Sequence, residues 1–215
     1  KIAEVEGTNF KIAQSIAHSL AMGIDKMGHA TLVVPGGSSP LDIFAHLSKI
    51  SIQWTKVTII LGDDRLVDVS HEHSNEQLIM KNLFMKEAKA AHYISLADPL
   101  LEVSQLDLPF NVVLLGIGLD GHFASLFPDL LDQDRLFNAD APHEIYSSEI
   151  PLGDPLHLRK TMNTSLLLSA NRCILLVSNL SKRKLVDEAM SNNQLPLYYL
   201  LNQSRLEIEF SDINF

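Results

Sequence analysis

A glycine-rich segment at residues 116–128, GIGLDGHFASLFP, places Asp120 two residues before His122, directly after an apolar run. Histidine exchanges protons near neutral pH, and a carboxylate on the same tight turn can hold its ring in one tautomer. We interpret His122 as a candidate general base supported by Asp120, with Gly118 and Gly121 permitting the turn. Because no serine stands in a Gly-x-Ser-x-Gly motif, we expect the imidazole to activate water. An ordinary glycine-rich turn with an exposed histidine is the alternative.

A second glycine-rich segment, PGGSSP at residues 35–40, also follows an apolar run and opens a helical pattern. Unobstructed backbone N–H groups at a helix start, together with serine hydroxyls, suit a phosphate monoester. The segment is neither a Walker A motif, because no Gly-Lys-Ser/Thr follows, nor a dinucleotide fingerprint, because the third glycine is absent. A plain helix start with an N-cap serine before proline is equally compatible. The candidate phosphate-binding residues are Gly36, Gly37, Ser38 and Ser39.

Two acidic residues and an arginine follow a third apolar run. Asp63 and Asp64 beside Arg65 predict an ion network that fixes the guanidinium and leaves part of its fork for a ligand oxygen. Asn75 is a supporting residue in the same region, and a solvated charged turn is the alternative. A His-x-His pair at 71–73 resembles a metal pair, but no other ligands at zinc-like spacing accompany it, so no metal site is predicted.

Two late cations complete the candidate set. Arg159 precedes a predicted helix, and Lys182 follows the predicted strand 172–177 at another carboxyl end. Both can neutralise the charge of a phosphate dianion. A lysine within the sequence Ser-Lys-Arg-Lys is often an ordinary surface cation, which is the alternative for Lys182.

Alternating apolar runs and amphipathic segments predict the elements that position these residues. The pattern is typical of an α/β fold, a three-layer sandwich with a mainly parallel, Rossmann-like sheet covered by helices on both faces. Strands are expected at 30–34, 56–61, 91–94, 111–115, 172–177 and 205–210. Helices are expected at 9–27, 40–49, 75–87, 121–127, 161–169 and 181–191, with an irregular excursion and a short helix over 129–160. Ligands bind at loops that follow the carboxyl ends of parallel strands, where the candidate residues lie.

Composition sets the broad class. A chain of 215 residues that is 46% hydrophobic predicts one globular domain spanning 1–215. A formal net charge of −9 argues against nucleic acid and anionic membranes as partners, so an anionic substrate needs a locally positive pocket. The single cysteine, Cys173, lies in an apolar run and fits a reducing compartment. No apolar stretch is long enough to span a membrane, and we expect a cytoplasmic protein.

Taken together and in this order, the motifs resemble those of the 6-phosphogluconolactonase family, within the wider glucosamine-6-phosphate isomerase/deaminase-like superfamily. The resemblance covers nearly the whole chain. It is carried by the segment GGSSP at 36–40, by Asp63-Asp64-Arg65 with Val67, His71, Ser74 and Asn75, by the segment 116–128, and by Arg159 and Lys182.

The resemblance implies hydrolysis of 6-phospho-D-glucono-1,5-lactone to 6-phospho-D-gluconate, in the oxidative pentose phosphate pathway, without a cofactor. It implies that His122 is the general base for the attacking water, that Asp120 supports it, and that Arg65 stabilises charge near the lactone. The phosphate is then held by Ser38, Ser39, Arg159 and Lys182.

Four positions depart from the family's pattern: Asp64 stands for Glu, His73 for Asp, Phe123 for Thr and Asp129 for Gly. Two alternatives remain open. One is a deaminase or isomerase acting on an amino-sugar phosphate, which needs a further carboxylate base. The other is a non-catalytic sugar-phosphate-binding module on the same fold. The sequence leaves open whether the chain is a monomer or a homodimer.

Overall fold

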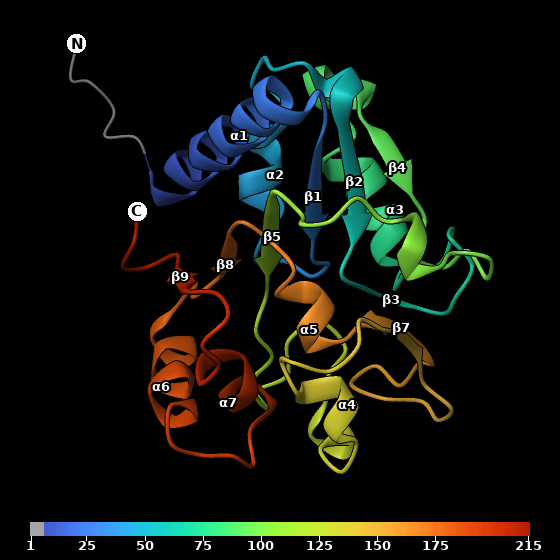
Figure 1. The fold of residues 1–215 in the computed structure, drawn as a ribbon, viewed down its shortest axis with the longest axis vertical. Coiled ribbons are helices and arrows are strands. Elements are labelled where there is room, and N and C mark those ends of the chain that lie inside the picture. Colours follow the sequence, from blue (N-terminus) through green and yellow to red (C-terminus); the bar gives the residue numbers. More distant parts are fainter. Residues whose placement is uncertain (1–6) are drawn as a thin grey trace.

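The computed structural model describes residues 7–215 and contains a six-stranded parallel sheet with the strand order β4-β2-β1-β5-β8-β9 (Figure 1). Its strands are β1 (Ala30–Val34), β2 (Val57–Leu61), β4 (His92–Ile94), β5 (Val112–Leu115), β8 (Cys173–Leu175) and β9 (Ile208–Phe210). The predicted α/β fold with a mainly parallel sheet is therefore confirmed, although most strands are shorter than expected.

The sheet forms where the chain is continuously apolar. All residues of β1, β5 and β8 are buried, which is typical of parallel strands covered on both faces. The register of β1 with β2 runs from Ala30↔Val57 to Val34↔Leu61, so both strands end at the same edge. The loops that follow β1, β2 and β5 consequently meet there. Cys173 is completely buried within β8, as expected for a core residue.

Seven helices of residues 7–215 flank the sheet and its carboxyl edge. They are α1 (Thr8–Met27), α2 (Leu41–Leu47), α3 (Asn75–Asn82), α4 (Asp134–Phe137), α5 (Thr164–Leu167), α6 (Leu180–Ala189) and α7 (Pro196–Leu201). Short 3-10 turns occupy Trp54–Lys56, Lys86–Ala90, Val103–Gln105 and Pro128–Leu130. Figure 1 shows α1 and α2 beside the upper half of the sheet, whereas α4 to α7 gather beyond the carboxyl ends of the strands. None of the helices in the described part of the chain is long and apolar enough to cross a membrane.

A second, antiparallel sheet has the order β3-β7-β6, with β3 at Asp63–Arg65, β7 at Arg159–Met162 and β6 at Ile145–Ser147. The sequence did not predict it. The helix expected over 161–169 begins only at Thr164, because the preceding residues form the central strand of this sheet. Arg159 therefore opens a strand rather than preceding a helix. The expected excursion 129–160 does contain a short helix, α4.

The helix predicted over 121–127 is wrong. Gly121 and Ala124 have φ angles of 82° and 49°, which a right-handed helix does not accommodate. The segment instead turns twice and closes with a bridge between Phe123 and Leu126. Both of those side chains, and that of Phe127, are buried in the core. Apolar spacing that imitates a helix here reflects a tightly packed loop.

Candidate active site

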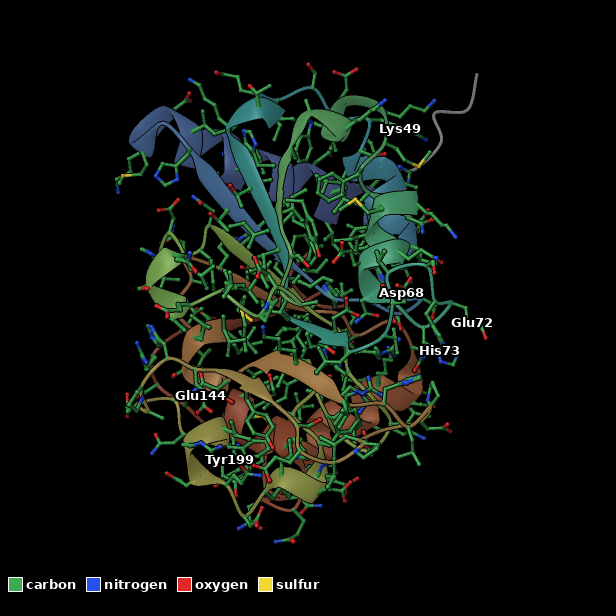
Figure 2. The ribbon with its side chains drawn as sticks, turned by 90° about the vertical axis from the view of Figure 1, so that its right-hand side faces the viewer. Lys49, Asp68, Glu72, His73, Glu144 and Tyr199 are labelled. Atoms are coloured by element: carbon green, nitrogen blue, oxygen red, sulfur yellow. The ribbon has the colours of Figure 1, made fainter. Side chains whose placement is uncertain are left out.

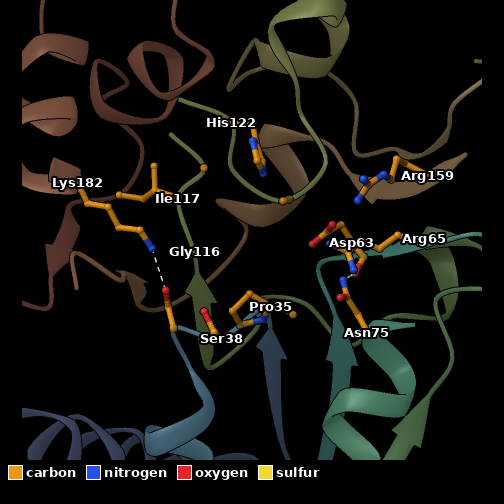
Figure 3. Close-up of a pocket in the computed structure, with 15 residues that line it drawn as sticks. Pro35, Ser38, Asp63, Arg65, Asn75, Gly116, Ile117, His122, Arg159 and Lys182 are labelled. Atoms are coloured by element: carbon orange, nitrogen blue, oxygen red, sulfur yellow. Dashed lines mark hydrogen bonds between the residues drawn. The ribbon is translucent and has the colours of Figure 1, made fainter. Parts of the chain in front are cut away.

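A cavity of about 240 Å³ lies at the carboxyl edge of the parallel sheet, where the loops after β1, β2 and β5 meet (Figure 3). All the predicted site residues line it except Asp64, Asp120 and Gly121. The lining residues are Pro35, Gly36, Gly37, Ser38, Ser39, Asp63, Arg65, Asn75, Gly116, Ile117, Gly118, His122, Ala124, Arg159 and Lys182. The structure thus brings together segments that are more than a hundred residues apart.

The imidazole of His122 is held by Asp120. Its Nδ1 lies 2.5 Å from Asp120 Oδ1, and the backbone N–H of His122 donates to the same oxygen at 3.2 Å. Burial alone raises the pKa of the Asp120 carboxyl, but its hydrogen bonds and attraction to His122 outweigh this and hold the pKa below its usual range. The carboxylate therefore keeps the proton on Nδ1. Nε2, which has no partner within residues 7–215, is left to accept a proton.

The turn that carries this pair is closed by hydrogen bonds from Gly118 N to His122 O, at 2.9 Å, and from Gly121 N to Gly118 O, at 3.0 Å. A Cβ atom on Gly118 would lie 2.0 Å from Cε1 and 2.1 Å from Nδ1 of the imidazole. Only glycine therefore allows the ring to lie over this backbone. The other side of the ring packs on Phe127, with the ring centroids 4.3 Å apart.

The 36–39 loop forms one wall of the cavity. Gly37 has a φ of 78°, and a Cβ on Gly36 would lie 2.0 Å from the Asn75 amide oxygen, so both positions favour glycine. The alternative of an N-cap serine is not observed, since Pro40 occupies the N-cap position of α2 without a side-chain cap. Ser39 instead accepts a hydrogen bond from Lys182.

Lys182 enters the cavity from α6. Its Nζ donates to Ser39 Oγ at 2.8 Å, and its backbone N–H is capped by Asn179. No carboxylate oxygen lies within 4.0 Å of this ammonium in the described structure. The pKa of Lys182 is lowered because burial leaves the ammonium incompletely hydrated, and no described carboxylate neutralises its charge. These properties distinguish it from an ordinary surface lysine.

Arg65 and Arg159 face each other in the register of β3 and β7. Arg65 Nη1 donates to His73 O at 2.8 Å, and its buried Nε has no hydrogen-bond partner within residues 7–215. Arg159 donates from Nε and Nη2 to two backbone carbonyl oxygens and lies over the Phe127 ring. Burial, and then the Arg65 guanidinium, lower the pKa of Arg159. Figure 3 shows this pair and Lys182 on opposite sides of the cavity.

The predicted ion network of Asp63 and Asp64 with Arg65 is wrong, because neither carboxylate comes within 4.0 Å of the guanidinium. Asp64 instead accepts three backbone N–H bonds, from Arg65 at 2.7 Å, Asn75 at 2.8 Å and Glu76 at 3.1 Å. Burial raises the pKa of Asp64 to about 6 even though these donors favour the charged form. The carboxylate thus anchors the start of α3 under the cavity floor.

Among the described residues that line the cavity, Asp63 is the only one with a carboxylate. It accepts a 2.6 Å hydrogen bond from Ser125 Oγ, and its backbone carbonyl accepts one from the Asn75 amide at 3.1 Å. The sequence did not predict this contact, since Asp63 and Ser125 are far apart in the chain. The bond ties the loop after β5 to β3.

A family model described as glucosamine-6-phosphate isomerases/6-phosphogluconolactonase matches residues 6–208. The chain belongs to this family. It is similar to a 6-phosphogluconolactonase of Mesorhizobium japonicum, with 33% identity over 192 residues that span 84% of this chain and 79% of that protein. It is also similar to a 6-phosphogluconolactonase of Pseudomonas aeruginosa, with 30% identity and the same two shares. The crystal structure of a 6-phosphogluconolactonase from Shewanella baltica is 29% identical, with a TM-score of 0.84 over 94% of this chain and 91% of that one.

Proposed function

We propose that this chain hydrolyses 6-phospho-D-glucono-1,5-lactone to 6-phospho-D-gluconate, a step of the oxidative pentose phosphate pathway. The observation that carries the proposal is the convergence of one carboxylate-held imidazole and three unpaired cations on a single cavity. The names of the similar proteins support the same substrate. The reaction consumes only water and the lactone, and we place it in the cytoplasm, in keeping with a single buried thiol.

In the proposed mechanism, His122 Nε2 removes a proton from water as the water oxygen attacks the lactone carbonyl carbon. The resulting oxyanion collapses, the bond from that carbon to the ring oxygen breaks, and the proton returns from Nε2 to the leaving oxygen. Asp120 holds the ring orientation and stabilises the transient imidazolium. General-base assistance of this kind contributes about 10²–10⁴-fold in rate.

The cations provide the positive pocket that a chain with a net charge of −9 needs for an anionic substrate. We assign the phosphate to Lys182, Arg159 and the 36–39 loop, and charge stabilisation near the lactone to Arg65. None of the three cations has a carboxylate partner within residues 7–215, so a bound anion supplies the missing counter-charge. Phosphate contacts to guanidinium and ammonium groups are among the strongest hydrogen bonds in proteins.

The geometry disfavours the alternative of a deaminase or isomerase. Moving a proton between neighbouring sugar carbons requires a carboxylate base that faces the substrate. The one carboxylate lining the cavity, Asp63, is 7% exposed and is bound by Ser125. A binding module without catalysis has no need of the Asp120–His122 pair, in which the carboxylate oxygen lies 2.5 Å from the imidazole Nδ1.

The test is acid release from freshly prepared 6-phosphogluconolactone in a pH-stat, compared with spontaneous hydrolysis in the same buffer. Glucosamine 6-phosphate, with ammonia release as the readout, is the parallel substrate. The proposal expects rapid acid release and no ammonia. Acid release at the spontaneous rate, or ammonia release, would overturn it.

A further inference from the structure

Three histidine rings pack against one another beside the arginine pair. The ring centroids are 4.9 Å apart for His71 and His73, 5.0 Å for His73 and His157, and 5.5 Å for His71 and His157. His73 Nδ1 lies 2.8 Å from His157 Nε2. Figure 2 shows His73 on the loop that projects at one side of the molecule, next to the smaller sheet. Within residues 7–215 no three potential ligands are arranged to hold a metal ion, so we consider a structural role for the hydrogen bond between the rings.

Each end of this hydrogen bond belongs to a segment that holds one guanidinium. The carbonyl oxygen of His73 accepts the 2.8 Å bond from Arg65 Nη1. On the other side, the carbonyl of Leu152 accepts from Arg159 Nε at 3.1 Å and from the backbone N–H of His157 at 3.3 Å. The ring-to-ring bond therefore connects the carbonyl that holds one arginine to the hairpin that holds the other.

The charges of Asp63 and Asp64 act on the arginine pair only at a distance, and they partly offset the lowering of the pKa of Arg159. Neither guanidinium lies within 4.0 Å of a carboxylate in the described structure. The backbone joins the two segments through the β3–β7 ladder, in which Arg65 faces Arg159, and through a bond from Leu66 N to Leu158 O at 2.8 Å. The hydrogen bond between the imidazoles of His73 and His157 joins the two segments through side chains. It lies close to the carbonyl groups that hold the two guanidiniums.

We propose that His73 and His157 are positioning residues, whose mutual hydrogen bond sets the relative position of the Arg65 and Arg159 guanidiniums for the anionic substrate. The inference rests on the proposed function, since it concerns the same cavity. The two side chains act through the arginines and do not themselves line the cavity. Because a guanidinium binds anions through fixed donor geometry, a change in this relative position weakens binding more than it slows the chemical step.

The hydrogen bond between His73 and His157 depends on pH. An imidazole pair needs one donor and one acceptor nitrogen, so it cannot survive protonation of both rings. The groups that face it are Glu72, 4.0 Å from His73 Nε2, Asp68 near His71, and the two guanidiniums. Partial burial, and then His73 and Arg159, lower the pKa of His157, which keeps the link intact at neutral pH. In acid, the hydrogen bond between the rings breaks, and the guanidiniums are no longer held in their relative position.

The test compares His157→Ala with His157→Gln, whose side-chain amide reaches the Nε2 position and does not titrate in this range. The exposed His18 on α1 supplies the control His18→Gln. Calorimetry measures the Kd of 6-phosphogluconate at pH 7.5 and pH 5.5, and the pH-stat measures kcat and KM for the lactone. We expect His157→Ala to raise Kd and KM about fivefold at pH 7.5, the effect of one lost hydrogen bond, with kcat nearly unchanged. His157→Gln retains the parent affinity at pH 7.5 and loses less of it at pH 5.5 than the parent does.

An affinity of His157→Ala equal to that of the parent, or equal pH dependence in His157→Gln and the parent, would overturn the inference. If His157→Ala does not fold, the pH dependence of His157→Gln decides. The two proposals fail separately. A parent chain that binds 6-phosphogluconate through this link but does not hydrolyse the lactone refutes the function alone, whereas hydrolysis with an unaffected His157→Ala refutes the positioning role alone.

Discussion

Replacing Gly118 with alanine tests whether the orientation of the His122 ring matters for the reaction. The new Cβ would lie 2.0–2.1 Å from two ring atoms, whereas ordinary van der Waals contact begins near 3.4 Å. The ring must therefore move by more than an ångström, away from the 2.5 Å bond with Asp120. Misplacement of a catalytic group by about 1 Å can cost about 10²-fold in rate. We expect kcat to fall by about that factor.

The fold should tolerate this change. Gly118 does not have a positive φ, so alanine brings no backbone strain, and the clash is with the end of a movable side chain. The KM should change little, because the 36–39 loop and the cations stay in place. Gly62→Ala is the control, since Gly62 does not line the cavity and its added methyl group makes ordinary van der Waals contacts, at 3.4 and 3.5 Å.

The assay is pH-stat hydrolysis of the lactone, with thermal unfolding measured on the same samples. Gly118→Ala should lose kcat at an unchanged melting temperature, while Gly62→Ala keeps a kcat close to that of the parent. Equal kcat values for the two variants would show that the orientation of the His122 ring does not affect turnover, which contradicts the prediction.

Three further outcomes are expected. Lys182→Ala should raise KM by about 10-fold or more and leave kcat nearly unchanged, because phosphate contacts are common to the ground and transition states; an unchanged KM would return it to the role of a surface cation. Asp64 binds its proton more tightly in the folded state, with a pKa of about 6 against an ordinary 3.8. Its contribution to the free energy of unfolding should therefore fall by up to about 3 kcal/mol as the pH rises from 4 to 6; urea denaturation should show this slope in the parent and not in Asp64→Asn. Ser125→Ala should lower the free energy of unfolding by about 1–3 kcal/mol, because it leaves the buried Asp63 carboxylate without its hydrogen-bond donor. An unaltered midpoint of urea denaturation would contradict this.

The parallel sheet and the position of the site could be predicted from the sequence because both depend on local signals. Continuous apolar runs marked β1, β2 and β5, and polar or glycine-rich residues followed each run directly. The rule that ligands bind beyond the carboxyl ends of parallel strands then brought Ser39, His122 and Arg65 to one edge.

The smaller sheet could not be predicted, since its strands are only three or four residues long and β3 pairs with β7 across about a hundred positions of the chain. The partners of the charged residues were missed for the same reason. Asp63 and Asp64 are adjacent to Arg65 in sequence, yet β3 directs the carboxylates to Ser125 and to the start of α3. The helix expected over 121–127 failed because a compact buried loop shows the same apolar spacing as a helix.

The role of His122 is tested by the turnover of His122→Gln on fresh lactone, measured together with the Kd of 6-phosphogluconate for the same variant. We predict that kcat falls by about 10²–10⁴-fold toward the spontaneous rate, while the Kd stays close to that of the parent. A kcat equal to that of the parent would contradict the assignment of His122 as the base.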